Sequence, residues 1–238
     1  MSKSNLQPLK KGNLSEQVYS AVRDALMDGK YEPGERLTIS GLASELGVSI
    51  TPVRETIFRL VSERALEMKA ATAIYVPEIS ADQLREIQTI RMLLEGKAAE
   101  VAASKVTPKQ LAKLEETHKA FQETAAKNPM KAAYLNREFH FALMEIAEMP
   151  MLYTTVENMW TLMGPLLRVF HVEAPSRDLT SGRHGHFDVL EALKERDGAM
   201  AQKAIQDDIA LGLNMVAWIE ARALEAPEPG ARVLSKLS

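Results

Sequence analysis

The chain has 238 residues, more than one domain usually contains, and this length favours a protein of two domains. It is 46% hydrophobic and 26% charged but only 5% aromatic, and it is rich in Ala, Leu, Met and Glu, a mixture that favours helices. The absence of cysteine excludes disulfides and thiolate metal sites, and the net charge of −3 argues against a nonspecific nucleic-acid coat.

Residues 1–13 are polar and lack the apolar centre of a signal peptide. No later segment approaches the roughly 18 uninterrupted apolar residues of a membrane-spanning helix. We therefore expect a cytoplasmic protein that does not span a membrane and that begins with a flexible segment.

The first regular element predicted is an amphipathic helix over residues 14–29. Leu14, Val18 and Val22 recur at helical spacing, and Gly29 is a suitable stop. A tight turn, YEPGERL, follows this helix.

Two short helices come next and predict a helix-turn-helix. Ser40 can cap a helix that ends at Gly47, and Ser49 can cap a second helix that runs from Pro52 through about Arg64. The three-residue turn between them is typical of this motif. Residues 65–79 then read as a small hairpin, which would be a wing.

From Ser80 onward the pattern is helical almost to the end of the chain, and it predicts six or seven helices packed as a bundle. Ser80, Thr107 and Asp197 are the expected helix caps. Residues 225–238 contain Pro and Gly without a clear period, so we expect a flexible tail. The breaks fall near Thr107-Pro108, Asn128-Pro129, Met149-Pro150 and residues 174–185.

The run LASELGVSITPVRETIFRL, preceded by EPGERL, resembles the GntR superfamily of regulators, whose motif reads close to LA..LGVSRTPVREAL. The resemblance covers residues 14–76 and implies a winged helix-turn-helix over residues 14–78 that binds operator DNA through the second helix in the major groove. Arg54 would contact a guanine edge or a phosphate. The candidate DNA-binding residues are Ser40, Ser49, Thr51, Pro52, Arg54 and Arg59.

Two positions depart from the family motif. Ile50 replaces the usual Arg between Ser and Thr, and the usual wing-tip Gly corresponds to Ala73. Because an Arg contact to phosphate is lost, we expect weaker or differently directed DNA binding. The charge distribution agrees weakly with an N-terminal DNA contact, since residues 1–76 carry 10 Lys and Arg against 9 Asp and Glu, and the remainder carries 19 against 23.

The C-terminal half resembles the FadR-like branch with an FCD ligand-binding domain, through IRMLLEGKAAEVAA, NREFH and HFDVLEALKERDGAMAQKAIQDD. This resemblance implies an all-α bundle over residues 79–224 that holds a divalent metal. Asn136 and His140 are four residues apart and share one helix face, His186 fits the third ligand position, and Asp208 stands where the family usually has His.

Such a mixed ligand set suits zinc first, with manganese, iron or nickel as alternatives. His184 is a substitute for His186, and a buried His is also often a hydrogen-bonded core residue without metal. Arg91 would clamp an effector carboxylate, although Arg91 and Glu95 could instead form an ordinary helix ion pair.

The predicted function is that of a homodimeric DNA-binding regulator, a repressor, whose operator affinity is controlled by a small organic or sugar acid. One alternative is a degenerate, metal-free regulator or dimerisation module, prompted by Ile50, Ala73 and Asp208. Another is a metal-dependent enzyme built on His140, His186 and Asp208, although the sequence offers no general base, so we expect a protein that is not an enzyme.

Overall fold

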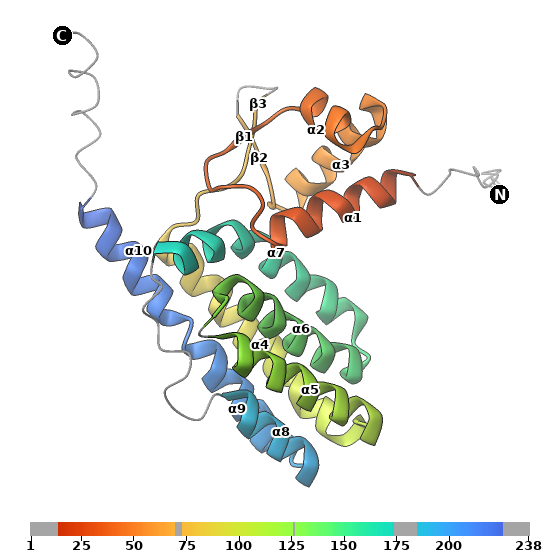
Figure 1. The fold of residues 1–238 in the computed structure, drawn as a ribbon, viewed down its shortest axis with the longest axis vertical. Coiled ribbons are helices and arrows are strands. Elements are labelled where there is room, and N and C mark those ends of the chain that lie inside the picture. Colours follow the sequence, from red (N-terminus) through yellow and green to blue (C-terminus); the bar gives the residue numbers. More distant parts are fainter. Residues whose placement is uncertain (1–13, 70–72, 126, 174–184, 226–238) are drawn as a thin grey trace, which may run out of the picture.

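The structure is a computed structural model that describes residues 14–69, 73–125, 127–173 and 185–225. Within these ranges the chain is mainly helical. Three helices and a small three-stranded sheet lie at one end of a larger helical bundle (Figure 1). The predicted fold class, a winged helix-turn-helix followed by an all-α bundle, is confirmed. Residues 1–13 and 226–238, expected to be flexible, lie outside the described residues.

The N-terminal part, here called the head, has its own apolar core. The side chains of Leu26, Val53, Ile57 and Ile74 are almost completely buried there. Its three strands pair antiparallel in the order β1-β3-β2. The elements of the head are α1 (Leu14–Met27), β1 (Arg36–Leu37), α2 (Ile39–Leu46), α3 (Ile50–Ser62), β2 (Glu67–Lys69) and β3 (Ala73–Tyr75).

The ends of the two short helices differ in part from the prediction. Thr38 is the cap of α2, because its backbone is extended and its hydroxyl accepts a hydrogen bond from the Gly41 N–H at 3.1 Å; Ser40 was the wrong choice and lies inside the helix. Gly47 ends α2 with a φ of 65°, as predicted. Ser49 stands at the N-cap position of α3, but its side chain makes no capping hydrogen bond within the described structure. The helix begins at Ile50 and ends at Ser62 instead of running from Pro52 to about Arg64.

The wing also differs from the expectation. The two residues of β1 were not predicted as a strand, and they become one by pairing with β3, where Arg36 lies opposite Tyr75. Ala73 is the first residue of β3 and lies opposite Lys69, so it belongs to a strand and not to the wing tip. Its φ is not positive, so alanine is not strained at this position.

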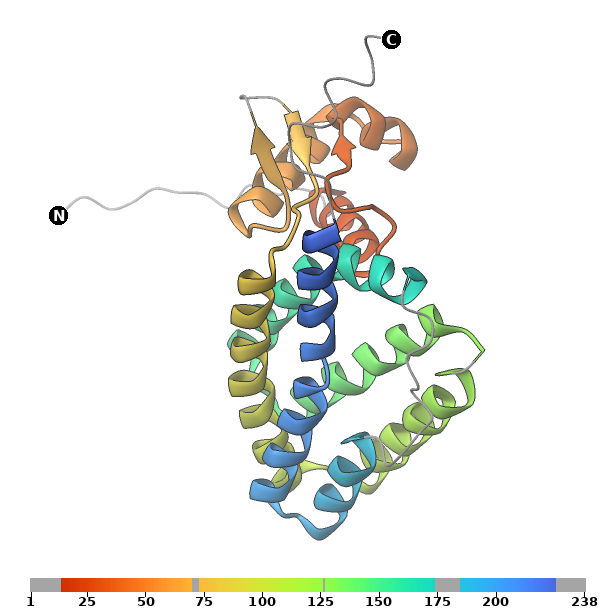
Figure 2. The ribbon, with the colours of Figure 1, turned by 90° about the vertical axis from the view of Figure 1, so that its left-hand side faces the viewer.

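The bundle is organised around α4, which packs against α6, α7, α8, α9 and α10. Figure 2 shows α4 and α10 running side by side below the sheet. No helix in the described ranges has both the length and the apolar character needed to cross a membrane. The helices are α4 (Ala81–Lys105), α5 (Pro108–Ala125), α6 (Pro129–Ala147), α7 (Pro150–Glu173), α8 (Gly185–Glu195), α9 (Gly198–Ala210) and α10 (Leu213–Glu225).

The predicted caps of the bundle helices are present. Ser80 and Gln83 form a reciprocal capping box at the start of α4. Thr107 accepts a hydrogen bond from the Gln110 N–H before α5, and the Asp197 side chain accepts one from the Met200 N–H before α9. The seven helices of the described bundle agree with the six or seven predicted.

The head joins the bundle where the end of α1 lies directly on α7. A Cβ atom placed on Gly164 of α7 would lie 2.7 Å from the Cα of Met27 and closer still to the carbonyl oxygen of Leu26. The absence of a side chain at Gly164 therefore allows the backbone of α1 to touch α7.

Two ion pairs hold the same junction. Arg23 of α1 binds Glu157 of α7 at 2.9 Å, and Arg137 of α6 binds Asp28, just beyond α1, at 2.7 Å. The Arg137 side chain is only 10% exposed, so this pair is screened by water much less than a surface pair. The junction ties the head to two helices of the bundle.

Candidate functional site

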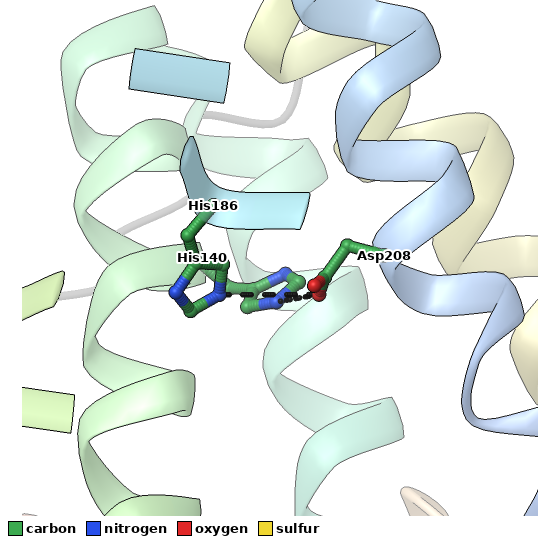
Figure 3. Close-up of side chains that lie close together, drawn as sticks. All are labelled: His140, His186 and Asp208. Atoms are coloured by element: carbon green, nitrogen blue, oxygen red, sulfur yellow. Dashed lines mark hydrogen bonds and ion pairs between the residues drawn. The ribbon is translucent and has the colours of Figure 1, made fainter. Parts of the chain in front are cut away.

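Three of the predicted ligands meet inside the bundle. His140 comes from α6, His186 from α8 and Asp208 from α9, and their side chains point toward one another (Figure 3). The Nε2 atom of His140 lies 3.1 Å from Oδ2 of Asp208, and Nε2 of His186 lies 3.9 Å from the same oxygen. All three residues are buried.

This arrangement fits a divalent cation. One donor atom from each residue lies within 4.8 Å of the other two. Ligands about 2.1 Å from a tetrahedral ion stand roughly 3.4 Å apart, so these donors need to move little to bind one ion. Asn136, one turn before His140, lines a cavity beside these three residues, to which His140 and Asp208 also contribute. His184 lies outside the described residues.

Glu95 of α4 orients the His140 imidazole, a role that the sequence did not reveal. Its Oε2 atom lies 2.5 Å from Nδ1 of His140, which places Nε2 toward Asp208. A metal-binding His usually donates its second N–H to such a carboxylate, which fixes the ring and the tautomer. The contact joins residues 45 positions apart in two helices, so no local spacing signals it.

The charges of this cluster support one another. Burial by itself would raise the pKa of the Glu95 carboxyl, but Arg91 and His140 outweigh burial and lower this pKa to about 2. Burial would lower the pKa of His140, yet Glu95 and Asp208 outweigh it and raise that pKa. The Glu95 carboxyl is therefore ionised at neutral pH, beside the His140 imidazole.

Arg91, the predicted effector clamp, is buried beside this cluster. Its Nε atom donates to Oε1 of Glu95 at 2.6 Å, and its guanidinium carbon lies 4.0 Å from the centre of the Trp160 ring. The ion pair with Glu95 therefore exists, as the alternative interpretation proposed. Arg91 nevertheless lines the cavity and can turn a donor toward a ligand.

The cavity beside the triad has a volume of about 90 Å³. This is smaller than a typical ligand pocket of roughly 300 to 1,000 Å³, so it accommodates an ion and a very small acid. Among its walls are Gln88, Arg91, Asn136, His140, Trp160 and Asp208.

The start of α3 presents a second group of predicted residues to solvent. Ser49, Thr51 and Arg54 are exposed, and so is Ile50. Arg54 makes no ion pair or hydrogen bond with any described residue, so its guanidinium is available to a partner. Pro52 is buried and supports the first turn of the helix instead of facing outward.

Arg59 has a structural role in the head. It binds Glu16 of α1 and Glu63 at 3.1 Å each, and its guanidinium carbon lies 3.5 Å from the centre of the Tyr19 ring. Its side chain is 45% exposed. Ser40 is exposed near the start of α2.

Two family descriptions match the chain. "Bacterial regulatory proteins, gntR family" matches residues 14–76, and "FCD domain" matches residues 86–211. The chain belongs to the GntR family. It is an HTH-type regulator of the FadR-like branch, with the head as its GntR part and the bundle as its FCD domain.

Relatives of this GntR regulator agree with that assignment. The HTH-type transcriptional regulator McbR of Escherichia coli strain K12 is 37% identical over 190 residues, which are 79% of this chain and 86% of McbR. The HTH-type transcriptional repressor RspR of the same strain is 27% identical over 195 residues, 81% of this chain and 84% of RspR. The family is one of regulators, so the metal-dependent enzyme alternative is set aside.

A solved structure also resembles this regulator. The structure of E. coli McbR/YncC superposes with a TM-score of 0.80 at 33% identity, covering 87% of this chain and 99% of that chain. The similarity therefore extends over both the head and the bundle.

Proposed function

We propose that this chain is a ligand-responsive repressor that binds operator DNA as a homodimer in the cytoplasm. Residues 14–78 would bind DNA, and residues 79–224 would bind the effector and the second subunit. The observation that carries the proposal is the buried His140, His186 and Asp208 triad next to Arg91, in a chain that also exposes Arg54 on α3 without a partner among the described residues.

DNA binding would use the start of α3. Exposed hydroxyls at Ser49 and Thr51 and the positive end of the helix dipole favour phosphate, and Ser40 would add a further hydroxyl contact. Arg54 could bind a guanine edge with two hydrogen bonds. We assign Pro52 and Arg59 a supporting role, because the first is buried and the second is held by acidic partners on two sides.

The effector would be a small organic acid, or a sugar acid if the walls of the cavity beside the triad move apart to admit it. A divalent ion, zinc in the first instance or else manganese, iron or nickel, would be held by His140, His186 and Asp208, with Asn136 at the edge of the site. When bound, the ion supplies positive charge for a carboxylate. Arg91 would donate the second contact, and Glu95 keeps the His140 ring oriented.

The experiment that tests DNA binding is a mobility shift with the DNA upstream of the gene, at two salt concentrations. Wild type would be compared with Arg54→Ala and with Lys109→Ala, which removes an exposed cation from the bundle. We expect Arg54→Ala to weaken binding by about tenfold or more and Lys109→Ala to leave it unchanged. Equal binding by all three proteins would refute the assignment of Arg54.

Effector binding is tested separately by thermal shift with pyruvate, succinate and gluconate, using protein whose metal content has been measured. A ligand that binds only the native state raises the melting temperature, and the rise grows with the logarithm of the ligand concentration divided by its Kd. We expect stabilisation by at least one acid and its loss after chelation. Metal-free protein that no acid stabilises would favour the degenerate regulator, an alternative that Asp208 prompted.

A further inference from the structure

A second cavity lies at the junction between the head and the bundle. It has a volume of about 340 Å³, nearly four times that of the cavity beside the triad. Its walls come from the end of α1, the start of α6 and the middle of α7, which meet below the head in Figure 1. The charged residues that line it are Asp28, Lys131, Arg137 and Arg168.

The charges of this junction cavity are unbalanced. Arg137 already binds Asp28, the one carboxylate among the described residues of the wall. Arg168 and Lys131 make no ion pair with any described residue, and neither side chain donates a hydrogen bond there. The described residues of the wall therefore carry two more positive than negative charges, which makes the cavity attractive to anions.

The geometry of the wall holds part of this charge in place. A Cβ atom on Gly29 would lie 2.6 Å from Cβ of Arg168, so the base of the Arg168 side chain is packed against the turn after α1. Lys131 lies in the first turn of α6, whose N-cap is Asn128. The positive end of that helix dipole adds to the attraction for an anion.

The junction cavity adjoins the cavity of the triad. Ala133, Trp160, Leu167 and His171 line both of them. The Nε1 atom of Trp160 is buried without a hydrogen-bond partner in the described structure, so the dividing wall carries an unused donor. A ligand too large for the triad cavity would find room and charge on the other side of this wall.

We propose that the junction cavity is a binding site for a small anion that carries a phosphate or carboxylate group, held by Arg168, Lys131 and Arg137. The anion competes with Asp28 for Arg137, and it touches the end of α1, which belongs to the head. Binding of the anion does not depend on the proposed function. Its effect on operator affinity rests on the proposed function, because that effect requires a protein that binds DNA.

The test is isothermal titration calorimetry of the full chain, after treatment with a chelator, with inorganic phosphate and with acetate at constant ionic strength. Arg168→Gln keeps most of the side-chain stem and removes the charge; Lys109→Gln removes an exposed cation that lines neither cavity. We expect Arg168→Gln to bind about tenfold more weakly, because a hydrogen bond between charged groups is of that size, and Lys109→Gln to bind like wild type. The stronger of the two probes identifies the class of anion.

A second variant distinguishes lost charge from misfolding. Asp28→Asn frees Arg137 from its carboxylate partner, so it should bind the anion several-fold more tightly than wild type. A damaged fold would not produce that gain. Three results would each overturn the site. They are absence of binding by wild type, equal affinity of wild type and Arg168→Gln, and weaker binding by Asp28→Asn than by wild type.

The consequence for DNA is measured by repeating the mobility shift with and without the better probe. We expect the anion to change the operator affinity of wild type but not that of Arg168→Gln. If no protein binds the operator, the proposed function fails while the calorimetric result stands.

Discussion

The head and the bundle place their proposed functional residues in opposite ways. In the head, Ser49, Thr51 and Arg54 lie within the N-cap and the first five residues of α3 and face solvent. In the bundle, His140 and Asp208 are 68 residues apart and meet in a buried cluster. An exposed surface that binds DNA can be formed by one contiguous segment of the chain, whereas a buried site for a small ligand needs side chains from several helices.

The comparison can be tested first at the proposed metal site, where we expect the largest effect. Asp208→Ala removes one of three converging donors, so metal affinity should fall by more than about a hundredfold. Asp207→Ala is the matched control, because Asp207 is the preceding residue but is 61% exposed and binds Lys203. Metal content after dialysis measures both; equal content in the two variants would contradict the assigned site.

A smaller effect is expected at Glu95, which contacts the proposed metal ligand His140 but is not itself a proposed ligand. Glu95→Gln keeps the size of the side chain but weakens its hold on His140, so metal affinity should fall by about tenfold to a hundredfold. Competition with a metal-binding dye measures the change. Glu100→Gln on the same helix should have no effect, and an unchanged affinity in Glu95→Gln would show that the His140 ring is oriented without it.

The head can be tested by adding a contact. Ile50 is 49% exposed at the start of α3, next to Thr51. Ile50→Arg should tighten DNA binding by roughly tenfold at low salt and steepen the dependence of log affinity on log salt by about one unit, as one more phosphate contact requires. Mobility shifts over a salt series measure both quantities. A slope equal to that of wild type would place Ile50 away from the DNA backbone.

The smallest effect separates two arginines of one helix. Arg59→Ala removes its ion pairs with Glu16 and Glu63 and its contact with Tyr19, so the free energy of unfolding should fall by about 1 kcal/mol. Arg54→Ala should change it by less than about 0.5 kcal/mol, because Arg54 has no partner in the described structure. Urea denaturation measures the free energy of unfolding of both variants. A larger loss in Arg54→Ala than in Arg59→Ala would contradict the structural role that we assign to Arg59.

The sequence predicted local features of the head well and features that depend on distant contacts less well. The helix-turn-helix and the end of α2 at Gly47 follow from helical spacing and from the conformational preference of glycine. The cap at Thr38 was missed because Ser40 is an equally good cap by residue type, and only the backbone angles separate them. Strand β1 was missed because two residues form a strand only through a partner.

The candidate site divides in the same way. Asn136 and His140 follow from their spacing on one helix, whereas His186 and Asp208 could be placed only through the resemblance to a family. The contact between Glu95 and His140 depends on how α4 packs on α6, so nothing in the sequence around either residue predicts it. The junction cavity is likewise a property of three helices together.

The close contact between the backbones of α1 and α7 at Gly164 has a consequence for chimaeras made from related regulators. A chimaera that joins the head of one relative to the bundle of another at the connection near residue 79 leaves α1 and α7 from different parents. Their contact tolerates no side chain on the α7 side, so a bundle with alanine at this position would push the foreign head out of place even if each half folds. Exchangeable units in such hybrids therefore need to be chosen by the surface between α1 and α7, and not by the linker alone.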